Sequence, residues 1–252
     1  MKHQHKPDTS LWISGINPAR EALVSTHVTV EEMVIARSDQ RIDELVELAR
    51  KRGIPVRKET KENLSVIVGH THHQGVGLRA PEYPYTDLDA LLKLPMHERE
   101  PLFILDSIQD PQNLGAMLRS GGFLGAKGIL IPKDRSVRVT ATVIKIAAGA
   151  TAYVPVVQVV NLTRALEQLK ESGLWIAGLD VEGSIPVYNA DLTIPTGLVV
   201  GNEQKGLRPL VRKHCDLLVS IPSNGPIQSL NAASAGTVVL AELQRQRLAK
   251  GL

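Results

Sequence analysis

The sequence predicts an α/β protein: a small α/β domain followed by a larger domain built on a parallel β-sheet with helices on both faces. Two observations predict this fold class. Apolar strand-like runs alternate with helix-like runs along most of the 252 residues, and such alternation is typical of parallel sheets. The apolar content of 43% is that of an ordinary globular chain.

The first eighty residues predict the smaller domain. A helix opens at Asn17-Pro18, where proline suits the first helical turn, and a second helix stops at Gly53. Short strand-like runs separate the helices. The expected helices are 17–23, 41–51 and 63–68, and the expected strands are 32–36, a run from Val56, and 75–79.

A segment rich in proline and charge follows, PEYPYTDLDALLKLPMHEREP, at 81–101. Breaks marked by proline flank one short expected helix, 87–92. We predict that residues 81–100 link an N-terminal domain of residues 1–80 to a second domain of residues 101–252.

The second domain repeats the alternation and ends on an unusual helix. Ligands of open parallel sheets bind beyond the carboxyl ends of the strands.

The last helix is expected to open at about Ser229, and it carries no charge as far as Ala241, so we expect it to be buried on every side. The expected strands are 102–105, 128–131, 154–157, 174–179, 198–200 and 217–221.

Composition narrows the function classes. A net charge of +3 and a pI near 9.0 permit a nucleic-acid partner, but aromatic residues make up only 3%, so base-stacking candidates are few. A single cysteine, Cys215, excludes an intrachain disulfide and a cysteine-based zinc site. The chain shows no membrane-length apolar run and no signal-peptide core, so we expect a cytoplasmic protein with no membrane partner.

Two short motifs are only weak evidence for a nucleotide site and a metal site. GVGLRA at 75–80 matches a dinucleotide fingerprint, but Pro81 stands where the helix would have to open. The histidine-rich run at 70–73 lacks nearby carboxylates or cysteines, so no metal site is predicted.

Three polar loops follow three of the expected strands. The first leads into a helix with Asn113 and Arg119, where Arg119 stands on one helical face with Gly115 and Gly122 and could meet a phosphate. The second carries Glu203 after a buried strand. The third contains Ser229 and Asn231 at the start of the uncharged helix. All three loops are expected at one edge of the sheet.

These loops carry a family resemblance. NLGAMLR with Asn113 and Arg119, GNEQKGL with Glu203, and IPSNGPIQSLNAA with Ser229 and Asn231 resemble, in order, the three motifs of the SpoU (TrmH-like) RNA 2′-O-ribose methyltransferases. Residues 12–23 resemble the start of the family's N-terminal RNA-binding domain, which is related in fold to a ribosomal protein, and 73–75 fits its end. The whole arrangement is most similar to bacterial enzymes that methylate a guanosine of 23S ribosomal RNA.

The resemblance implies a trefoil-knotted catalytic domain and a homodimer, with the last helix passing through the knot into the dimer interface. It implies S-adenosylmethionine as cofactor, bound near Leu179, Gly201, Ile221 and Leu230, and no metal. It implies that Arg119 stabilises the developing alkoxide or clamps a phosphate, because an arginine is a poor base. Asn113, Glu203, Ser229 and Asn231 would orient the ribose and Arg119. Two alternatives are a tRNA ribose methyltransferase and a non-catalytic RNA-binding protein on the same fold.

Overall fold

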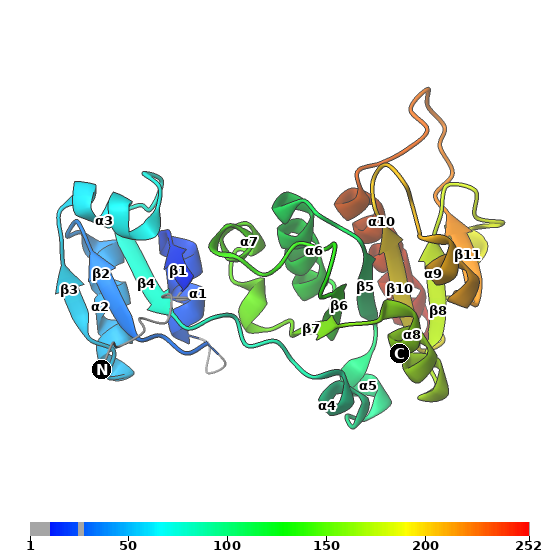
Figure 1. Cartoon of the computed structure of the whole chain (residues 1–252), viewed down its shortest axis with the longest axis horizontal. Helices are drawn as coiled ribbons and strands as arrows, with labels where there is room; N and C mark the ends of the chain where they lie inside the picture. Colours follow the sequence, from blue (N-terminus) through cyan, green and yellow to red (C-terminus); the bar gives the residue numbers. More distant parts are fainter. Residues whose placement is uncertain (1–10, 25–27, 252) are drawn as a thin grey trace, which may run out of the picture. The chain divides into compact units, whose positions relative to one another are not determined.

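The computed structural model describes residues 11–24 and 28–251, which fall into two compact units (Figure 1). The first unit extends to residue 84 and also takes in residues 139–153. The second unit contains residues 85–138 and the chain from 154 onward. Among the described residues, no helix is both long enough and apolar enough to cross a membrane.

The first unit is a four-stranded sheet with helices. The sheet has the order β1-β4-β2-β3, in which β4 runs antiparallel to β1 and β2, and β3 runs parallel to β2. Its elements are β1 (Leu11–Ser14), α1 (Ile16–Val24), β2 (Glu32–Ile35), α2 (Gln40–Lys51), β3 (Val56–Lys58), α3 (Lys61–Val68), β4 (Val76–Ala80), α7 (Ala141–Ala147) and the 3-10 turn η1 (Ala150–Ala152).

Local sequence explains these elements well. The side chain of Asp39 caps α2 by accepting from the amides of Arg41 and Ile42, and Thr60 caps α3 in the same manner. Gly69 ends α3 in the left-handed conformation that favours glycine. Strand β1 was not expected from the sequence, because its four residues are too short to show a clear alternation.

The second unit contains a seven-stranded sheet of order β7-β6-β5-β10-β8-β11-β9, in which every paired strand is parallel. The parallel sheet predicted from the sequence is therefore confirmed. Its strands are β5 (Leu102–Asp106), β6 (Gly128–Pro132), β7 (Val156–Val159), β8 (Trp175–Leu179), β9 (Ile185–Pro186), β10 (Thr196–Gly201) and β11 (Leu217–Ser220). Its helices are α4 (Leu88–Leu92), α5 (Met96–Arg99), α6 (Pro111–Phe123), α8 (Leu162–Glu171), η2 (Val187–Asn189), α9 (Pro209–His214) and α10 (Ala232–Lys250).

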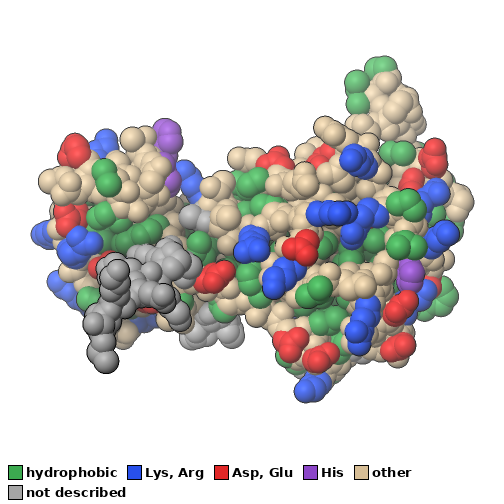
Figure 2. Space-filling view, viewed as in Figure 1, with side chains coloured by type: hydrophobic (Ala, Val, Ile, Leu, Met, Phe, Trp, Pro, Cys, Tyr) green, Lys and Arg blue, Asp and Glu red, His purple; other side chains and the backbone are tan. Residues whose placement is uncertain are grey.

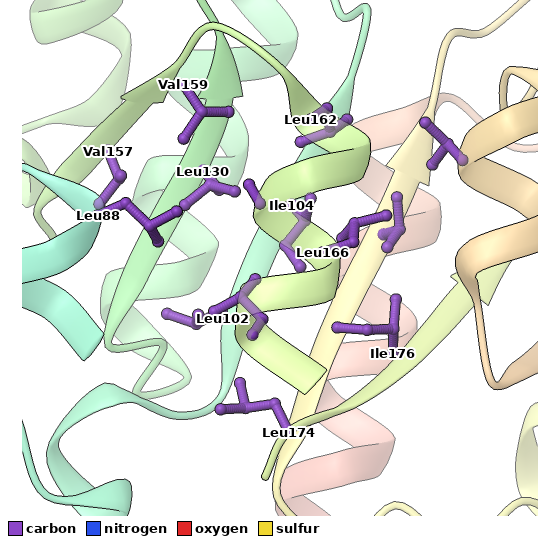
Figure 3. Close-up of a cluster of buried hydrophobic side chains, with 14 of the residues drawn as sticks. Leu88, Leu102, Ile104, Leu130, Val157, Val159, Leu162, Leu166, Leu174 and Ile176 are labelled. Carbon is purple, nitrogen blue, oxygen red and sulfur yellow. The ribbon is translucent and has the colours of Figure 1, made fainter. Parts of the chain in front are cut away.

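Alternate residues of the strands supply two apolar layers. Leu102 and Ile104 of β5 join the cluster beneath α8, which contributes Leu162 and Leu166 (Figure 3). On the opposite face, Phe103 lies against α10 near Gly236. The sheet is therefore covered by helices on both faces, as expected for a parallel sheet.

The observed units differ from the expected domains at the linker. Thr86 forms a β-bridge with Val157, and Leu88 and Leu91 of α4 are buried in the core of the second unit. Residues 85–100 thus pack as part of the second unit. Residues 139–153 were expected in the second domain but pack in the first unit, where the hydroxyl of Tyr153 donates to Glu21 at 3.1 Å. A segment rich in proline looks like a linker in sequence, but the short helix α4 within it still buries Leu88 and Leu91.

The terminal helix departs from two expectations. It begins at Ala232 rather than near Ser229, because the side chain of Asn231 caps it by accepting from the amides of Ala233 and Ser234 at 2.9 and 3.2 Å. It is also not buried on every side of the single chain. One stripe is exposed or half-buried, namely Ser234, Val238, Ala241, Arg245 and Leu248.

The polar end of α10 is held within the chain. Arg247 is buried and pairs with Glu100 at 2.5 Å, and its guanidinium also donates to the carbonyl of Ile194 at 2.9 Å. A guanidinium can be buried in this way once carboxylate and carbonyl partners are supplied.

Gly236→Leu is expected to destabilise the second unit by about 1–3 kcal/mol through overpacking. A Cβ at this position would lie 3.2 Å from atoms of both Phe103 and Val200, inside a packed layer. Urea unfolding measures the effect. Ala249→Leu, on the exposed end of the same helix, is the matched control and should change stability little. Equal stability of the two variants would contradict this packing.

Candidate functional site

The loops with the motif residues lie at one edge of the second sheet. Strands β5 and β10 are neighbours, and β11 lies two places beyond β10, with β8 between them. All are parallel, so their carboxyl ends face the same edge. The convergence expected from the sequence is therefore present.

Three side chains from the three loops form one hydrogen-bonded relay. The amide nitrogen of Asn113, in the first turn of α6, donates to the carboxylate of Glu203, which follows β10. The amide nitrogen of Asn231, at the start of α10, donates to the amide oxygen of Asn113 at 2.7 Å. Asn113 is only 4% exposed. The relay joins residues that are 90 and 118 positions apart in sequence.

The direction of the hydrogen bonds in this relay is set by the N-terminus of α10. The side-chain oxygen of Asn231 accepts from two backbone amides, which can only donate. Its NH2 group is therefore the part that faces Asn113, whose oxygen must accept. The NH2 group of Asn113 is then left to donate to the carboxylate of Glu203. An ionised carboxylate accepts hydrogen bonds and cannot donate them.

Backbone contacts hold the loops beneath the relay. The side chain of Asn202 donates to the carbonyl of Ser107 at 3.2 Å, which ties the β10 loop to the β5 loop. Asn202 and Gly206 pair through both backbone hydrogen bonds, and this closes a tight turn with Glu203 near its tip. The turn needs glycine at Gly206, where φ is +62°.

A buried ion pair supports the same edge. The carboxylate of Asp106, at the end of β5, is fully buried. It accepts from the guanidinium of Arg208 at 2.6 Å and from the backbone amide of Arg208 at 2.7 Å. The charge of Asp106 is therefore compensated, and the residue holds the start of α9 against β5. Sequence reasoning missed this pair, because its members are 102 positions apart.

Arg119 and Ser229 are not brought into the relay. Arg119 is exposed on α6, six residues after Asn113 and about 9 Å farther along the helix axis. Among the side chains that the structure describes, it has no hydrogen-bond or ion-pair partner. Gly115, on the same face, is buried, whereas Gly122 is exposed. Ser229 is exposed in the loop before α10 and lies outside the helix.

The residues expected to hold a cofactor lie at the ends of β8, β10 and β11 and before α10. Leu179 and Ile221 are half-buried, and Leu230 is 53% exposed. Gly201 is required, because a Cβ there would lie 2.3 Å from the backbone of Gly206. The loop 221–231 projects from the second unit and has an apolar tip (Figures 1 and 2). Accessible apolar side chains at this edge fit the base of a nucleoside.

Other reactive side chains have structural roles. Burial raises the pKa of the Cys215 thiol to about 12, so it is not a nucleophile at neutral pH. His73 is fully buried between the hydroxyl of Ser65 and the amide of Gly75, and this burial lowers its pKa. Among the described residues, no group of three or more His, Cys, Asp or Glu could hold a metal. The GVGLRA motif lies mainly in strand β4, and no helix begins directly after it.

Comparison with known proteins decides the family. Residues 100–241 match the model of the SpoU rRNA Methylase family. Residues 12–86 match the model described as RNA 2′-O ribose methyltransferase substrate binding. The chain belongs to the SpoU rRNA methylase family. The resemblance seen in the three motifs is therefore confirmed, as are the fold class and the enzyme class, an S-adenosylmethionine-dependent RNA 2′-O-methyltransferase.

Relatives of this SpoU family protein cover nearly the whole chain. The 23S rRNA (guanosine-2′-O-)-methyltransferase RlmB of Xanthomonas campestris pv. campestris is 42% identical over 242 residues, which is 94% of this chain and 97% of the relative. An uncharacterized tRNA/rRNA methyltransferase of Mycolicibacterium smegmatis is also 42% identical, over 96% of this chain and 78% of the relative.

Solved structures agree in fold. The SpoU methyltransferase AviRb from Streptomyces viridochromogenes, in complex with the cofactor AdoMet, superposes with a TM-score of 0.81 at 27% identity. The match covers 96% of this chain and 92% of AviRb. An AdoMet-bound rRNA methyltransferase from Sinorhizobium meliloti has a TM-score of 0.77 at 23% identity over 94% and 87% of the two chains, and supports the fold.

Asn113→Asp is expected to destabilise the protein by at least about 2 kcal/mol at pH 7, because it replaces the donor to Glu203 with a second carboxylate. A proton shared between the two carboxylates would restore the missing hydrogen bond. Folding of the variant then takes up a proton, so its deficit relative to wild type should shrink as the pH falls toward about 5.

Chemical denaturation at several pH values measures this effect. Gln112→Glu adds the same charge one residue earlier, at an exposed position, and serves as the control. A deficit of Asn113→Asp that stays constant with pH would contradict the contact between Asn113 and Glu203.

Proposed function

We propose that the protein methylates the ribose 2′-hydroxyl of a guanosine in 23S ribosomal RNA, acting in the cytoplasm as a homodimer. The relay of Glu203, Asn113 and Asn231 carries this proposal, because it assembles one residue from each family motif at a single point. The 42% identity to an RlmB enzyme over nearly its whole length supports the choice of 23S rRNA and guanosine.

Leu179, Gly201, Ile221 and Leu230 would hold the cofactor at the edge formed by β8, β10 and β11. When bound, S-adenosylmethionine supplies a methyl group that is carried on a sulfonium, and transfer of the methyl group leaves a neutral thioether. The knot that the family implies stays a prediction, and it would draw the 221–231 loop over this edge.

The relay orients the sugar, and Arg119 supplies positive charge. The second carboxylate oxygen of Glu203 can accept a hydrogen bond from a ribose hydroxyl while the first holds Asn113. Arg119 has no anionic partner among the described side chains, so its guanidinium is available to a phosphate or to the developing alkoxide. Ser229 would contact the RNA or the cofactor from the loop before α10.

The first unit would bind the RNA. A hollow of about 380 Å³ lies on it, lined by the polar or positive side chains of Arg37, Lys61, His72 and Gln74. Lys61 is exposed at the start of α3, and His72 is also exposed. Such a surface suits the negatively charged backbone of a structured RNA.

A second copy of the chain would cover the open stripe of α10. Phe123, at the end of α6, is 88% exposed, and Leu248 on α10 is 73% exposed. Gln244, one turn before Leu248, donates to the carbonyl of Leu124, so the ends of α6 and α10 lie together. Large side chains exposed this far on adjacent helices support the proposed interface. Arg119 lies one turn before Phe123, so an interface here would place each Arg119 close to it.

Arg119→Ala is expected to abolish methyl transfer while the fold and cofactor binding are retained. The reason is that Arg119 is exposed and has no partner among the described side chains, so its removal costs no internal contact. Ribose methylation is mapped nucleotide by nucleotide in ribosomal and transfer RNA from cells that contain only the variant. Arg164→Ala, another exposed arginine of the second unit, is the control.

Loss of one 23S methylation with Arg119→Ala supports the proposal. Loss of a tRNA methylation instead would establish the tRNA alternative. If the variant keeps the wild-type rate, Arg119 has no catalytic role. If wild-type cells and deletion cells show the same methylation, the protein is a non-catalytic binder.

Phe123→Asp with Leu248→Asp is expected to convert the protein from dimer to monomer, because two charges would be buried in the interface. Sedimentation at micromolar concentration measures this shift. Val66→Asp, at an equally exposed apolar position of the first unit, is the control. A wild-type protein that sediments as a fully active monomer would refute the dimer.

A further inference from the structure

A fourth loop lies at the same edge of the sheet as the relay, although none of the three motifs includes it. It comprises residues 133–138, directly after the carboxyl end of β6, and β6 is the neighbour of β5 on the side away from β10. We name it the β6 loop. Its charged residues are Lys133, Asp134, Arg135 and Arg138, and all four are exposed.

The β6 loop is held firmly against the loop that leads to Asn113. The hydroxyl of Ser136 and the backbone amide of Val137 both donate to the carbonyl of Ile108, at 3.1 and 2.8 Å. The amide of Lys133 donates to the carbonyl of Val159 at 2.8 Å. Ile108 is fully buried, three residues before α6 begins. The β6 loop therefore keeps a defined position relative to the relay.

The three cations of this loop lack anionic partners. Arg208 and Arg212, elsewhere in the second unit, are paired with Asp106 and Asp180. By contrast, no ion pair or side-chain hydrogen bond is found for Lys133, Arg135 or Arg138 within residues 11–24 and 28–251. Arg135 is held at φ +57°, a left-handed conformation that non-glycine residues adopt at a cost. Positive charges held in place without partners are suited to an external anion.

We propose that Lys133, Arg135 and Arg138 bind the backbone phosphates of the RNA strand that flanks the target ribose. The inference rests on the proposed function and adds the path of the RNA. The loop has no aromatic side chain for stacking on a base, so phosphate is the group its chemistry fits.

The strand order favours RNA over the cofactor as the source of the anion. The expected cofactor residues follow β8, β10 and β11, whereas the β6 loop lies beyond β5 on the other side. From β6 there are two strand spacings to β10 with Gly201, or about 10 Å at ~4.8 Å per spacing, and three spacings to β8 with Leu179, or about 14 Å. The RNA strand would therefore cross the edge above β6 and β5 and present its ribose at the relay.

The test compares two triple variants of the full-length protein with equal loss of charge. The first is Lys133→Gln, Arg135→Gln and Arg138→Gln. The control is Lys93→Gln, Lys127→Gln and Lys213→Gln, three exposed lysines that precede β5, β6 and β11 and so belong to the opposite edge. Glutamine keeps most of the side-chain length, and thermal unfolding checks that each variant is folded.

Binding of a fluorescein-labelled single-stranded 20-mer RNA is measured against salt concentration, and S-adenosylmethionine binding is measured by calorimetry. Each lost phosphate contact should reduce the slope of log affinity against log salt by about 0.7, so three contacts reduce it by about 2. If affinities converge at 1 M salt, RNA binding at 0.1 M weakens about 100-fold. On unmodified 23S rRNA, KM should rise while kcat is largely retained, because the loop does not touch the reacting atoms.

The expected result is a reduced slope in the β6-loop variant, wild-type behaviour in the control, and unchanged cofactor affinity in both. Equal weakening of both variants would mean a general charge effect and would overturn the proposal. So would a loss of cofactor affinity with RNA binding intact, which would assign the cations to the cofactor carboxylate. If wild-type protein methylates no 23S rRNA, the substrate assignment fails, while the salt slopes still decide the role of the loop.

Discussion

The geometry of the site depends on the capping of α10 by Asn231. Two backbone amides occupy the oxygen of this side chain, so its NH2 group must be directed toward Asn113. That single constraint orients Asn113, which in turn holds the carboxylate of Glu203. A helix cap is ordinarily worth about 1 kcal/mol in stability. Here it also determines which oxygen atoms of the relay remain free for the ribose that we propose it orients.

The parallel sheet divides the chemistry among neighbouring strands. The relay occupies the ends of β5 and β10 and the start of α10, the expected cofactor residues follow β8, β10 and β11, and the cations of the β6 loop lie beyond β5. The carbonyls of Ser107 and Ile108 receive hydrogen bonds from the loops on both sides. These two residues connect the proposed RNA path to the edge proposed to be catalytic, so a shift in either loop would move the other.

Burial in α10 shows where periodicity alone is insufficient. The lack of charge from Ser229 to Ala241 indicated a helix covered on every side, and Gly236 is indeed packed against Phe103 and Val200. Yet Ala241 and Leu248 remain open, whereas Glu242 and Arg247, both charged, are buried through partners. Glu242 is paired with Arg245 one turn along the same helix, whereas the partners of Arg247, Glu100 and the carbonyl of Ile194, lie far away in sequence. Whether a polar side chain is buried depends on which groups the fold brings to it.

The sequence by itself determined the α/β class, most strands of the larger sheet, and the placement of Asn113 and Glu203 at one edge of that sheet, because buried strands and polar loops leave local patterns. It also predicted Asn231 at the same edge, but it put the start of α10 near Ser229. Only the tertiary structure decided that Asn113 contacts Glu203 and Asn231, that residues 85–100 pack on the second unit, and that the β6 loop joins the edge. These are contacts between distant segments, and their formation depends on strand order, which local periodicity does not encode.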